Sequence, residues 1–373
     1  MIITSIADHI LSPIGQTSEE SFRNLRAGDT AMRVHAFPGV PEAVCASLLD
    51  EEALRPLYEA LSLKERFTTF EKRLILSISS AAARTDIDLA SDRVLFILST
   101  TKGNISLLDQ AEGFPPERVH LGVSARRIAR HFGNERMPIV VSNACISGVC
   151  ALLTGMRALR EGWCDYAVVA GTDVQSRFII TGFQSFKALS QAPCRPFDAA
   201  RDGLNPGEAA ATVILTRAET APWEWVRGAV RNDANHISGP SRTGEGSFQA
   251  LEAALQGVDR RELAFVNVHG TATAYNDEME SIALHRAGLD AVPVTGLKGV
   301  FGHTMGAAGI LECILSMRAL EAGVVLPTAG YDTCGVSYPL QISNVERPAK
   351  GNAFVKVISG FGGCNAALTV RKR

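Results

Sequence analysis

The sequence predicts an α/β protein made of two similar halves, and two observations carry that prediction. Apolar strand-type runs alternate with helical patterns along most of the 373 residues, as in sheets that are covered by helices. The segments 148–162 and 309–323 also align without a gap, and Met-Arg-Ala-Leu recurs intact in both. Both segments are apolar nearly all round, so we expect two helices buried between sheets. We divide the chain into an N-terminal half, 1–222, and a C-terminal half, 223–373.

Apolar runs and turn residues predict the individual elements in order. The first is a strand over 2–12, after which Thr17 is a candidate N-cap for a helix with two glutamates in its first turn. The segment 30–65 contains several prolines and gives no clear order of elements. Further helices are predicted over 70–83, 124–132, 148–162 and 278–287 and up to about 322, and further strands over 93–98, 138–141, 166–171, 211–215, 225–230, 264–268 and 292–297 and on both sides of 360–365.

Composition excludes several classes of protein. A hydrophobic content of 46%, a charged content of 20% and a net charge of −2 fit a chain with a large core and give no sign of a nucleic-acid partner. Eight scattered cysteines without a C-x-x-C pair disfavour a metal or disulfide framework. Residues 137–156 carry no charge, but proline and polar residues interrupt them, so we expect no membrane span. The N-terminus lacks the basic segment of a signal peptide, so we expect a soluble, cytoplasmic protein.

Cys145 lies between a short strand-type run and a predicted helix. A tight turn there would place its side chain at the helix N-terminus, where unpaired N–H groups and a partial positive charge favour the reactive thiolate. The alternative is a buried structural cysteine, the usual state of a free thiol. The position at a change of backbone type favours a nucleophile.

Two histidines also follow predicted strands, each with small residues after it. His269 begins HGTATAYND, and His303 lies within LKGVFGHTMGAAG. A single histidine of this kind is commonly a hydrogen-bonded structural residue, but two of them favour a site, because small neighbours let a ligand approach the backbone. Neutral imidazoles can donate N–H groups to a developing oxyanion. Lys298 has uncharged neighbours and can orient that site, although a surface lysine is the alternative.

Six motifs in this order resemble those of the β-ketoacyl-[acyl carrier protein] synthases, condensing enzymes of the thiolase-like superfamily. They are SPIG at 12–15, NAC-x-SG around Cys145, RPFD-x-x-RDG-x-x-x-GE at 195–208, HGTAT-x-x-ND-x-x-E at 269–280, K-x-x-x-GHTMGAAG-x-x-E at 298–312 and GFGGCN at 360–365. The resemblance runs almost from end to end. It implies a five-layer αβαβα fold of two similar halves.

The resemblance also implies an acyltransferase reaction. This is the decarboxylative Claisen condensation of an acyl thioester with malonyl-[acyl carrier protein], which gives a 3-oxoacyl-[acyl carrier protein] in fatty acid or specialised polyene or polyketide biosynthesis. The substrates are carried on the phosphopantetheine of an acyl carrier protein, and no metal or other cofactor is expected. The expected partners are that carrier protein and a second subunit, in a homodimer or in a heterodimer with another synthase-like chain.

Residue roles follow from the same resemblance. Cys145 would accept the acyl group, and His269 and His303 would hold the malonyl thioester carbonyl while carbon dioxide leaves. The remaining implied roles are an oxyanion hole from the N–H groups of Cys145 and Phe361, a gate at Phe361, support of the histidines by Lys298 and Glu312, contacts of Thr271 and Thr273 with the phosphopantetheine arm, and structural positions for Asp277 and Glu280.

Three features depart from the family pattern or extend it. The loop STTKGNI at 99–105 and Ser359 replace glycine-rich and aromatic residues, and the chain is shorter than typical members. Lys102 in this loop either faces solvent or lines an acyl pocket for polar, conjugated or aromatic chains, and we favour the second. In the family the strand near 166–172 is expected to pair across a dimer axis, because an apolar edge is adhesive.

Other activities on the same fold remain as alternatives. A non-catalytic chain-length-factor type of subunit usually lacks the nucleophile that this chain retains. A degradative thiolase or a hydroxymethylglutaryl synthase uses different residues at the second site. A cysteine hydrolase is disfavoured because its local signature is absent.

Overall fold

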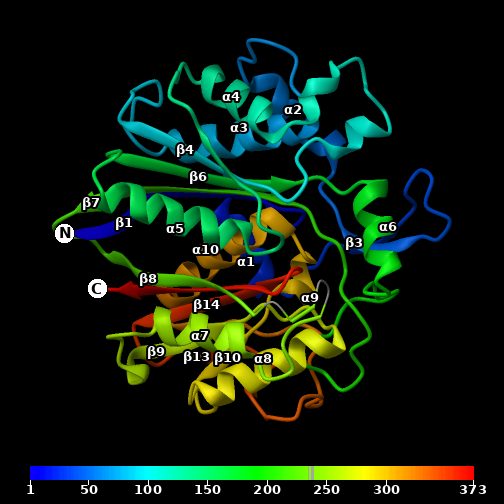
Figure 1. Ribbon diagram of the computed structural model, residues 1–373, viewed down its shortest axis with the longest axis vertical. Helices are drawn as coiled ribbons and strands as arrows, with labels where there is room; N and C mark the ends of the chain where they lie inside the picture. The colour runs from blue at the N-terminus through cyan, green and yellow to red at the C-terminus, as the bar shows by residue number, and fades with distance from the viewer. Residues whose placement is uncertain (234, 237–238) are drawn as a thin grey trace.

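Five layers stack along the long axis of the molecule in the computed structural model, which describes residues 1–373 except 234 and 237–238 (Figure 1). Helices α3 (Thr69–Ala82) and α4 (Leu121–His131) cover one sheet from outside. Helices α7 (Glu245–Ala254) and α8 (Ala274–Arg286) cover the other sheet. Between the two sheets lie α5 (Ser147–Arg160) and α10 (Ala308–Glu321). The predicted αβαβα architecture is therefore confirmed.

The two sheets share one topology. The first has the order β1-β7-β6-β4-β5, with strands Ile2–Leu11, Ala209–Ala218, Tyr166–Asp173, Val94–Ser99 and Ile139–Val141. The second has the order β12-β10-β9-β14-β15-β8, with strands Gln341–Ile342, Pro293–Thr295, Leu263–Asn267, Ala353–Gly360, Cys364–Lys372 and Trp223–Asn232. In the first sheet β5, β4 and β6 are parallel, and β7 and β1 run antiparallel to their neighbours. In the second sheet β10, β9 and β14 are parallel, and β15 and β8 run antiparallel to their neighbours. This correspondence agrees with the internal repeat, whereas the division at residue 222 stays a prediction.

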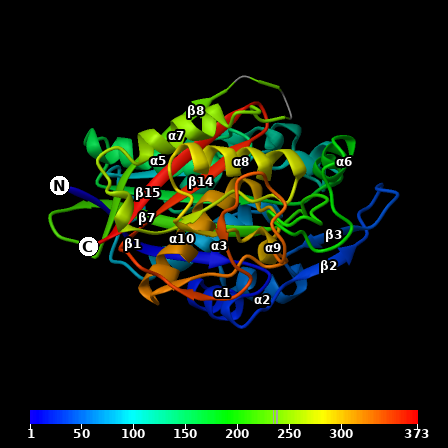
Figure 2. The same ribbon diagram turned by 90° about the horizontal axis from the view of Figure 1, so that it is seen from below.

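Most of the predicted elements are present, and Thr17 caps α1 (Ser18–Arg26) by accepting a hydrogen bond from the backbone N–H of Glu20 at 3.0 Å. The unassigned segment holds β2 (Met32–His35), β3 (Val44–Ser47) and α2 (Glu51–Ala60). The β2–β3 hairpin projects from the body, at the end opposite the two chain termini (Figure 2). The remaining elements are α6 (Arg177–Ser185), α9 (Lys298–Phe301), β11 (Val324–Val325) and β13 (Arg347–Pro348).

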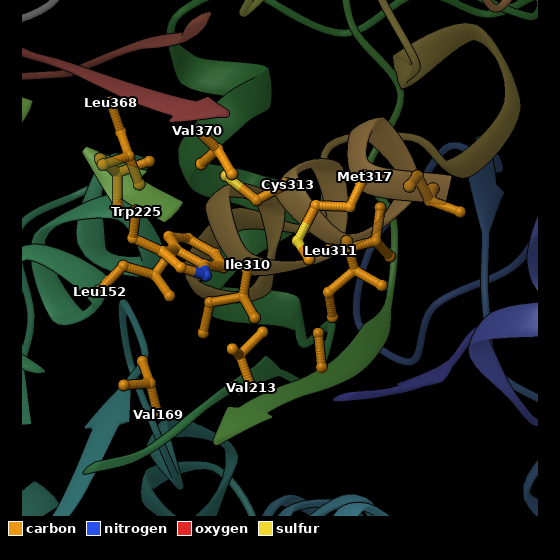
Figure 3. Packing of buried hydrophobic residues seen from close by; sticks show 14 of the residues in the cluster. Leu152, Val169, Val213, Trp225, Ile310, Leu311, Cys313, Met317, Leu368 and Val370 are labelled. Carbon is orange, nitrogen blue, oxygen red and sulfur yellow. The ribbon is translucent and has the colours of Figure 1, made fainter. Parts of the chain in front are cut away.

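The core lies where the central helices meet both sheets. Figure 3 shows side chains of α10 between strands of the first sheet and strands of the second. The labelled residues are Ile310, Leu311, Cys313 and Met317 of α10, Leu152 of α5, Val169 and Val213 of the first sheet, and Trp225, Leu368 and Val370 of the second. Helix α10 is buried on nearly every face, as the sequence indicates, whereas α5 leaves one face with Cys150, Thr154 and Arg157 half-buried or exposed.

The prediction that the strand near 166–172 pairs across a dimer axis is wrong. Strand β6 lies between β4 and β7 and is hydrogen-bonded on both sides, so it presents no edge. Its apolar sequence reflects burial within the sheet. The strand that ends the first sheet is β5. Among the described residues, none of the helices has both the length and the apolar character needed to cross a bilayer.

The first turns of α5 and α10 approach each other at glycines. A Cβ atom added to Gly309 would lie 2.6 Å from the backbone nitrogen of Val149. We therefore expect Gly309→Ala to lower the free energy of unfolding by about 1–3 kcal/mol, as overpacking does. The measurement is thermal and denaturant unfolding followed by circular dichroism.

Gly122 supplies the matched control, because it also lies in the first turn of a helix, α4, and an added Cβ would meet no atom within 4 Å. Gly122→Ala is expected to leave stability unchanged or to raise it slightly. Equal unfolding midpoints for the two variants would contradict the importance of the α5–α10 contact.

Candidate active site

A tight turn carries Cys145 from β5 to α5. Ala144 has φ of 43°, a left-handed conformation that is strained for a residue with a Cβ. The hydroxyl of Ser147 accepts a hydrogen bond from the backbone N–H of Asn143 at 2.8 Å and donates to the carbonyl of Ala144 at 2.6 Å. These bonds fix the turn and aim the thiol into a cavity rather than into the core.

The expected ease of ionisation of Cys145 is wrong. Burial raises the pKa of the Cys145 thiol to about 12, and the nearby Cys364 thiol acts in the same direction. Lys298 and the backbone N–H of Phe361 favour the thiolate but do not outweigh burial. The Cys145 side chain is therefore a neutral thiol, because burial disfavours the thiolate more than Lys298 and the N–H of Phe361 favour it.

The histidine loops come from the other half of the chain and meet this thiol. His269 follows β9, and His303 follows α9. Their rings are perpendicular, with centroids 5.1 Å apart. The sulfur of Cys145 and one nitrogen from each ring all lie within 4.8 Å of one another. Two nitrogen donors therefore face one buried sulfur.

Both imidazoles are neutral. Burial lowers the pKa of each histidine well below 6.5, and the charges of Lys298 and Lys356 add to this effect. The backbone N–H of Met305 donates to Nδ1 of His303 at 3.4 Å, so the ring proton of His303 lies on Nε2. That Nε2 atom and Nδ1 of His269 are buried without a hydrogen-bond partner among the described residues. Such atoms are available to a ligand.

A buried charge cluster lies near the histidines. Nζ of Lys298 donates to Glu312 at 2.8 Å, and Nζ of Lys356 lies 2.5 Å from the other oxygen of the same carboxylate. Burial disfavours the charged carboxylate, but the two lysines outweigh burial and hold the pKa of Glu312 below its usual value. Sequence analysis identified Lys298 and Glu312 and missed Lys356.

Two carboxylates hold the His269 loop. Glu280 accepts hydrogen bonds from the backbone N–H groups of His269 and Gly270, each at 2.7 Å. Asp277 accepts from the backbone N–H groups of Thr271 at 3.1 Å and Phe197 at 2.7 Å. Burial and the charge of Asp277 raise the pKa of Glu280 to about 7. Both acidic residues therefore have the structural positions that the resemblance implied.

A cavity of about 250 Å³ leads from Cys145 toward the surface. Thr271 and Thr273 line it, and their hydroxyl oxygens lie 2.9 Å apart. Phe361 also lines the cavity and packs edge-on against Phe186, with ring centroids 5.1 Å apart. An apolar wall with two hydroxyl groups suits a narrow, amide-bearing arm.

The two departures from the family pattern have different outcomes. Lys102 is exposed, its ammonium donates to the carbonyl of Thr101 at 3.3 Å, and it does not line the cavity. The favoured interpretation of Lys102 as polar pocket lining is therefore wrong for this structure. Ser359 does line the cavity, and its hydroxyl donates to the side-chain oxygen of Asn365 at 2.7 Å.

The same three side chains, Cys145, His269 and His303, form a set that can hold a metal ion such as zinc. Two observations disfavour that use. Nδ1 of His303 already accepts a backbone hydrogen bond, and the charges of Lys298 and Lys356 act on both imidazoles and would repel a dication. The arrangement therefore favours nucleophilic chemistry with hydrogen-bond donors.

Alkylation tests the state of the thiol. Because the pKa of Cys145 is raised to about 12, its thiolate fraction is small at pH 8 and grows about tenfold for each pH unit. We expect the rate of iodoacetamide alkylation at Cys145, followed by peptide mass spectrometry, to keep rising from pH 7 to pH 9.5. Exposed Cys334 in the same digest reports reagent activity. A rate that levels off near pH 8 would contradict the raised pKa.

Comparison with known proteins gives the family. The model "Beta-ketoacyl synthase, N-terminal domain" matches residues 3–221, and "Beta-ketoacyl synthase, C-terminal domain" matches residues 224–332. The tetracenomycin polyketide synthase ketoacyl synthase alpha subunit of Streptomyces glaucescens is 34% identical over 66% of this chain, and the match spans 63% of that relative. The 3-oxoacyl-[acyl-carrier-protein] synthase 2 of Vibrio cholerae is 28% identical, with 97% of each chain covered.

Solved structures agree with these relatives. The ketosynthase ApeO in complex with its chain length factor ApeC, from Xenorhabdus doucetiae, gives a TM-score of 0.90 at 25% identity and covers 100% of this chain and 98% of that one. The ishigamide ketosynthase/chain length factor gives a TM-score of 0.89 at 26% identity and covers 100% of this chain and 99% of that one. The chain therefore belongs to the β-ketoacyl synthase family, which confirms the resemblance drawn from the six motifs.

Proposed function

We propose that this chain catalyses the decarboxylative condensation of an acyl thioester with malonyl-[acyl carrier protein]. One observation carries the proposal: a buried thiol faces two neutral imidazoles, each with a ring nitrogen that has no partner in the described part of the chain. A soft nucleophile, fixed N–H donors and little water are what a thioester enolate requires. The matches to named 3-oxoacyl-[acyl-carrier-protein] synthases support the same reaction class.

In the first half-reaction, the sulfur of Cys145 attacks the carbonyl carbon of the acyl-carrier thioester. The new S–C bond forms as the bond to the phosphopantetheine sulfur breaks, and the thiol proton passes to the departing sulfur. The backbone N–H groups of Cys145 and Phe361 would hold the carbonyl oxygen in the tetrahedral intermediate. The N–H of Phe361 already favours the thiolate of Cys145, which supports this assignment.

In the second half-reaction, malonyl-carrier thioester enters with its carbonyl oxygen between His269 and His303. The C–C bond to the carboxylate breaks, carbon dioxide leaves, and the electron pair becomes an enolate whose oxygen accepts two imidazole hydrogen bonds. The enolate carbon then attacks the acyl carbonyl carbon, the C–S bond to Cys145 breaks, and the leaving thiolate takes up one proton from water. Because both imidazoles stay neutral, they donate hydrogen bonds without delivering a proton to the enolate.

The access route fits a phosphopantetheine arm. We propose that Thr271 and Thr273 contact the amides of the arm and that Phe361 opens to admit the acyl chain. The edge-on contact of Phe361 with Phe186 supports a gate, because a partly exposed ring that contacts other rings can swing without breaking hydrogen bonds. Phosphopantetheine substrates need no metal and no further cofactor for this chemistry.

We propose an acyl carrier protein as the substrate partner and a second synthase-like subunit as the structural partner. Solved structures similar to this one include two ketosynthases described with a chain length factor. Names among the relatives include polyketide synthases and 3-oxoacyl-[acyl-carrier-protein] synthases, so we propose fatty acid or specialised polyketide biosynthesis as the pathway. All eight cysteines are free, which is consistent with a cytoplasmic location.

Acylation provides the direct test. Wild-type protein incubated with an acyl carrier protein should gain one acyl group by intact-mass measurement, and Cys145→Ala should gain none. Cys150→Ala is the matched control, since Cys150 lies in the first turn of the adjacent helix and should leave acylation intact. Acylation of Cys145→Ala would rule out the assigned nucleophile, and absence of acylation in the wild type, with or without a partner subunit, would favour the chain-length-factor role.

Decarboxylation tests the histidines separately. His269→Ala and His303→Ala should each slow carbon dioxide release from malonyl-[acyl carrier protein] by about 10²–10³-fold, the usual cost of one oxyanion donor. Both variants should still acylate at Cys145. Normal release of carbon dioxide in either variant would contradict the role of that histidine.

Assembly is the third test. We expect the purified protein to sediment as a dimer at micromolar concentration, either alone or with a co-expressed synthase-like chain, because the edge of the first sheet at β5 is short and half-buried. Sedimentation velocity measures this state. A stable monomer in the presence of both a carrier protein and a synthase-like chain would contradict the expectation.

A further inference from the structure

Lys356 is a fully buried lysine that the proposed reaction does not use. It lies in the middle of β14, with Val355 and Val357 on either side. Burial lowers the pKa of Lys356, so keeping its ammonium group charged costs free energy that other contacts in the fold must offset. A buried ammonium persists only where oxygen atoms replace its hydration.

Four oxygen atoms surround the Lys356 ammonium. They are Oε2 of Glu312 at 2.5 Å, the carbonyl of Val268 at 2.8 Å, the side-chain oxygen of Asn267 at 2.9 Å and the carbonyl of Asn267 at 3.5 Å. An ammonium group has three donors, and these oxygens satisfy all of them. The group therefore occupies a complete oxygen cradle.

The cradle lies directly behind His269. Val268 is the residue before His269, and Asn267 ends β9 and donates to the hydroxyl of Ser316 on α10 at 2.9 Å. The Lys356 ammonium thus joins the end of β9 to β14 and to the carboxylate of Glu312. Movement of this ammonium would release the peptide that places the His269 ring.

The cluster also sets the local charge. Lys298 and Lys356 share the single carboxylate of Glu312, so within this trio the two ammonium groups exceed the carboxylate by one positive charge, and Glu280 beside His269 is the next carboxyl group that acts on Lys356. Burial, Lys298 and Lys356 all lower the pKa of His303. The same three causes, together with His303, lower the pKa of His269. With only one lysine, the pair with Glu312 would be neutral and the excess charge would vanish.

We propose that Lys356 is a positioning residue that acts as a tethered cation: it fixes the backbone at His269 and supplies the excess positive charge beside the two imidazoles. This inference rests on the proposed function of the histidines in decarboxylation. Glu312 then has two partners with different effects. Lys298 lies five residues before His303 in the chain, whereas Lys356 contacts the carbonyl of Val268, the residue before His269.

The oxygen cradle makes this proposal testable by chemical rescue. In Lys356→Ala the four oxygens would surround a hole of the size of the lost side chain, and a free ammonium ion can take the place of the lost group. In Lys356→Met the side chain fills the same space without a charge, so no ion can enter. The two variants are therefore matched in charge and differ in room for the cation.

The measurement uses full-length protein, or the protein with its partner subunit, and follows two partial reactions. Carbon dioxide release from malonyl-[acyl carrier protein] should fall about 10- to 100-fold in both variants, less than for loss of a direct donor. Acylation of Cys145, measured by intact mass, should change much less. Ammonium chloride should restore carbon dioxide release in Lys356→Ala, and sodium chloride at equal ionic strength should not.

Ammonium should have no effect on Lys356→Met, which separates rescue of the site from a general salt effect. Carbon dioxide release at the wild-type rate in either variant would overturn the inference. Equal loss of acylation and decarboxylation without rescue would also overturn it, as would failure of both variants to fold, because either result shows a role in stability alone. If the wild-type protein itself releases no carbon dioxide, the proposed function fails instead.

Discussion

The close approach of α5 and α10 at their first turns is the contact on which the site depends. A Cβ on Gly148 would lie 3.0 Å from the carbonyl of Gly306, and one on Gly309 would lie 2.6 Å from the backbone nitrogen of Val149. Cys145 lies two residues before α5, and His303 lies five residues before α10. The loops that precede the two duplicated helices therefore meet, one with a thiol and the other with an imidazole, although the repeat aligns Cys145 with Gly306 and not with His303. The duplication supplies the geometry, and divergence of the two halves supplies the chemistry.

Burial then decides the charge of every reactive group. It raises the pKa of Cys145 and lowers the pKa of both histidines, so thiol and imidazoles are neutral together. The formal charges belong to a neighbouring buried cluster, formed by Lys298, Lys356 and Glu312. This division suits a reaction whose charge develops on the substrate, because fixed dipoles stabilise an enolate without protonating it. A preformed thiolate between two imidazolium ions would instead be a stable ion cluster.

Sequence reasoning identified what local patterns encode and missed what depends on distant partners. The turn at Cys145 and the loops at His269 and His303 carry ordered motifs, so their positions after strands could be predicted. Lys356 could not, because a lysine that alternates with valines is typical of a strand with one face in water. In this fold β14 is an inner strand of its sheet, covered by helices on both faces, so the alternation points Lys356 at Glu312, which no spacing rule connects to it.

Strand β6 and Lys102 are two cases in which the sequence pattern led to a wrong prediction, because the outcome depends on distant partners. An apolar run such as Tyr166–Asp173 is compatible with an adhesive edge or with an inner strand, and only the sheet order distinguishes them. Lys102 belongs to a loop whose backbone is held by Asp173, which accepts from the N–H groups of Thr101 and Lys102. Because the backbone of this loop satisfies that buried carboxylate, the Lys102 side chain is left to point outward. The polarity of the loop therefore comes from a structural anchor, and the cavity at Cys145 is lined by Ser359, Phe361 and the aromatic residues near Phe361.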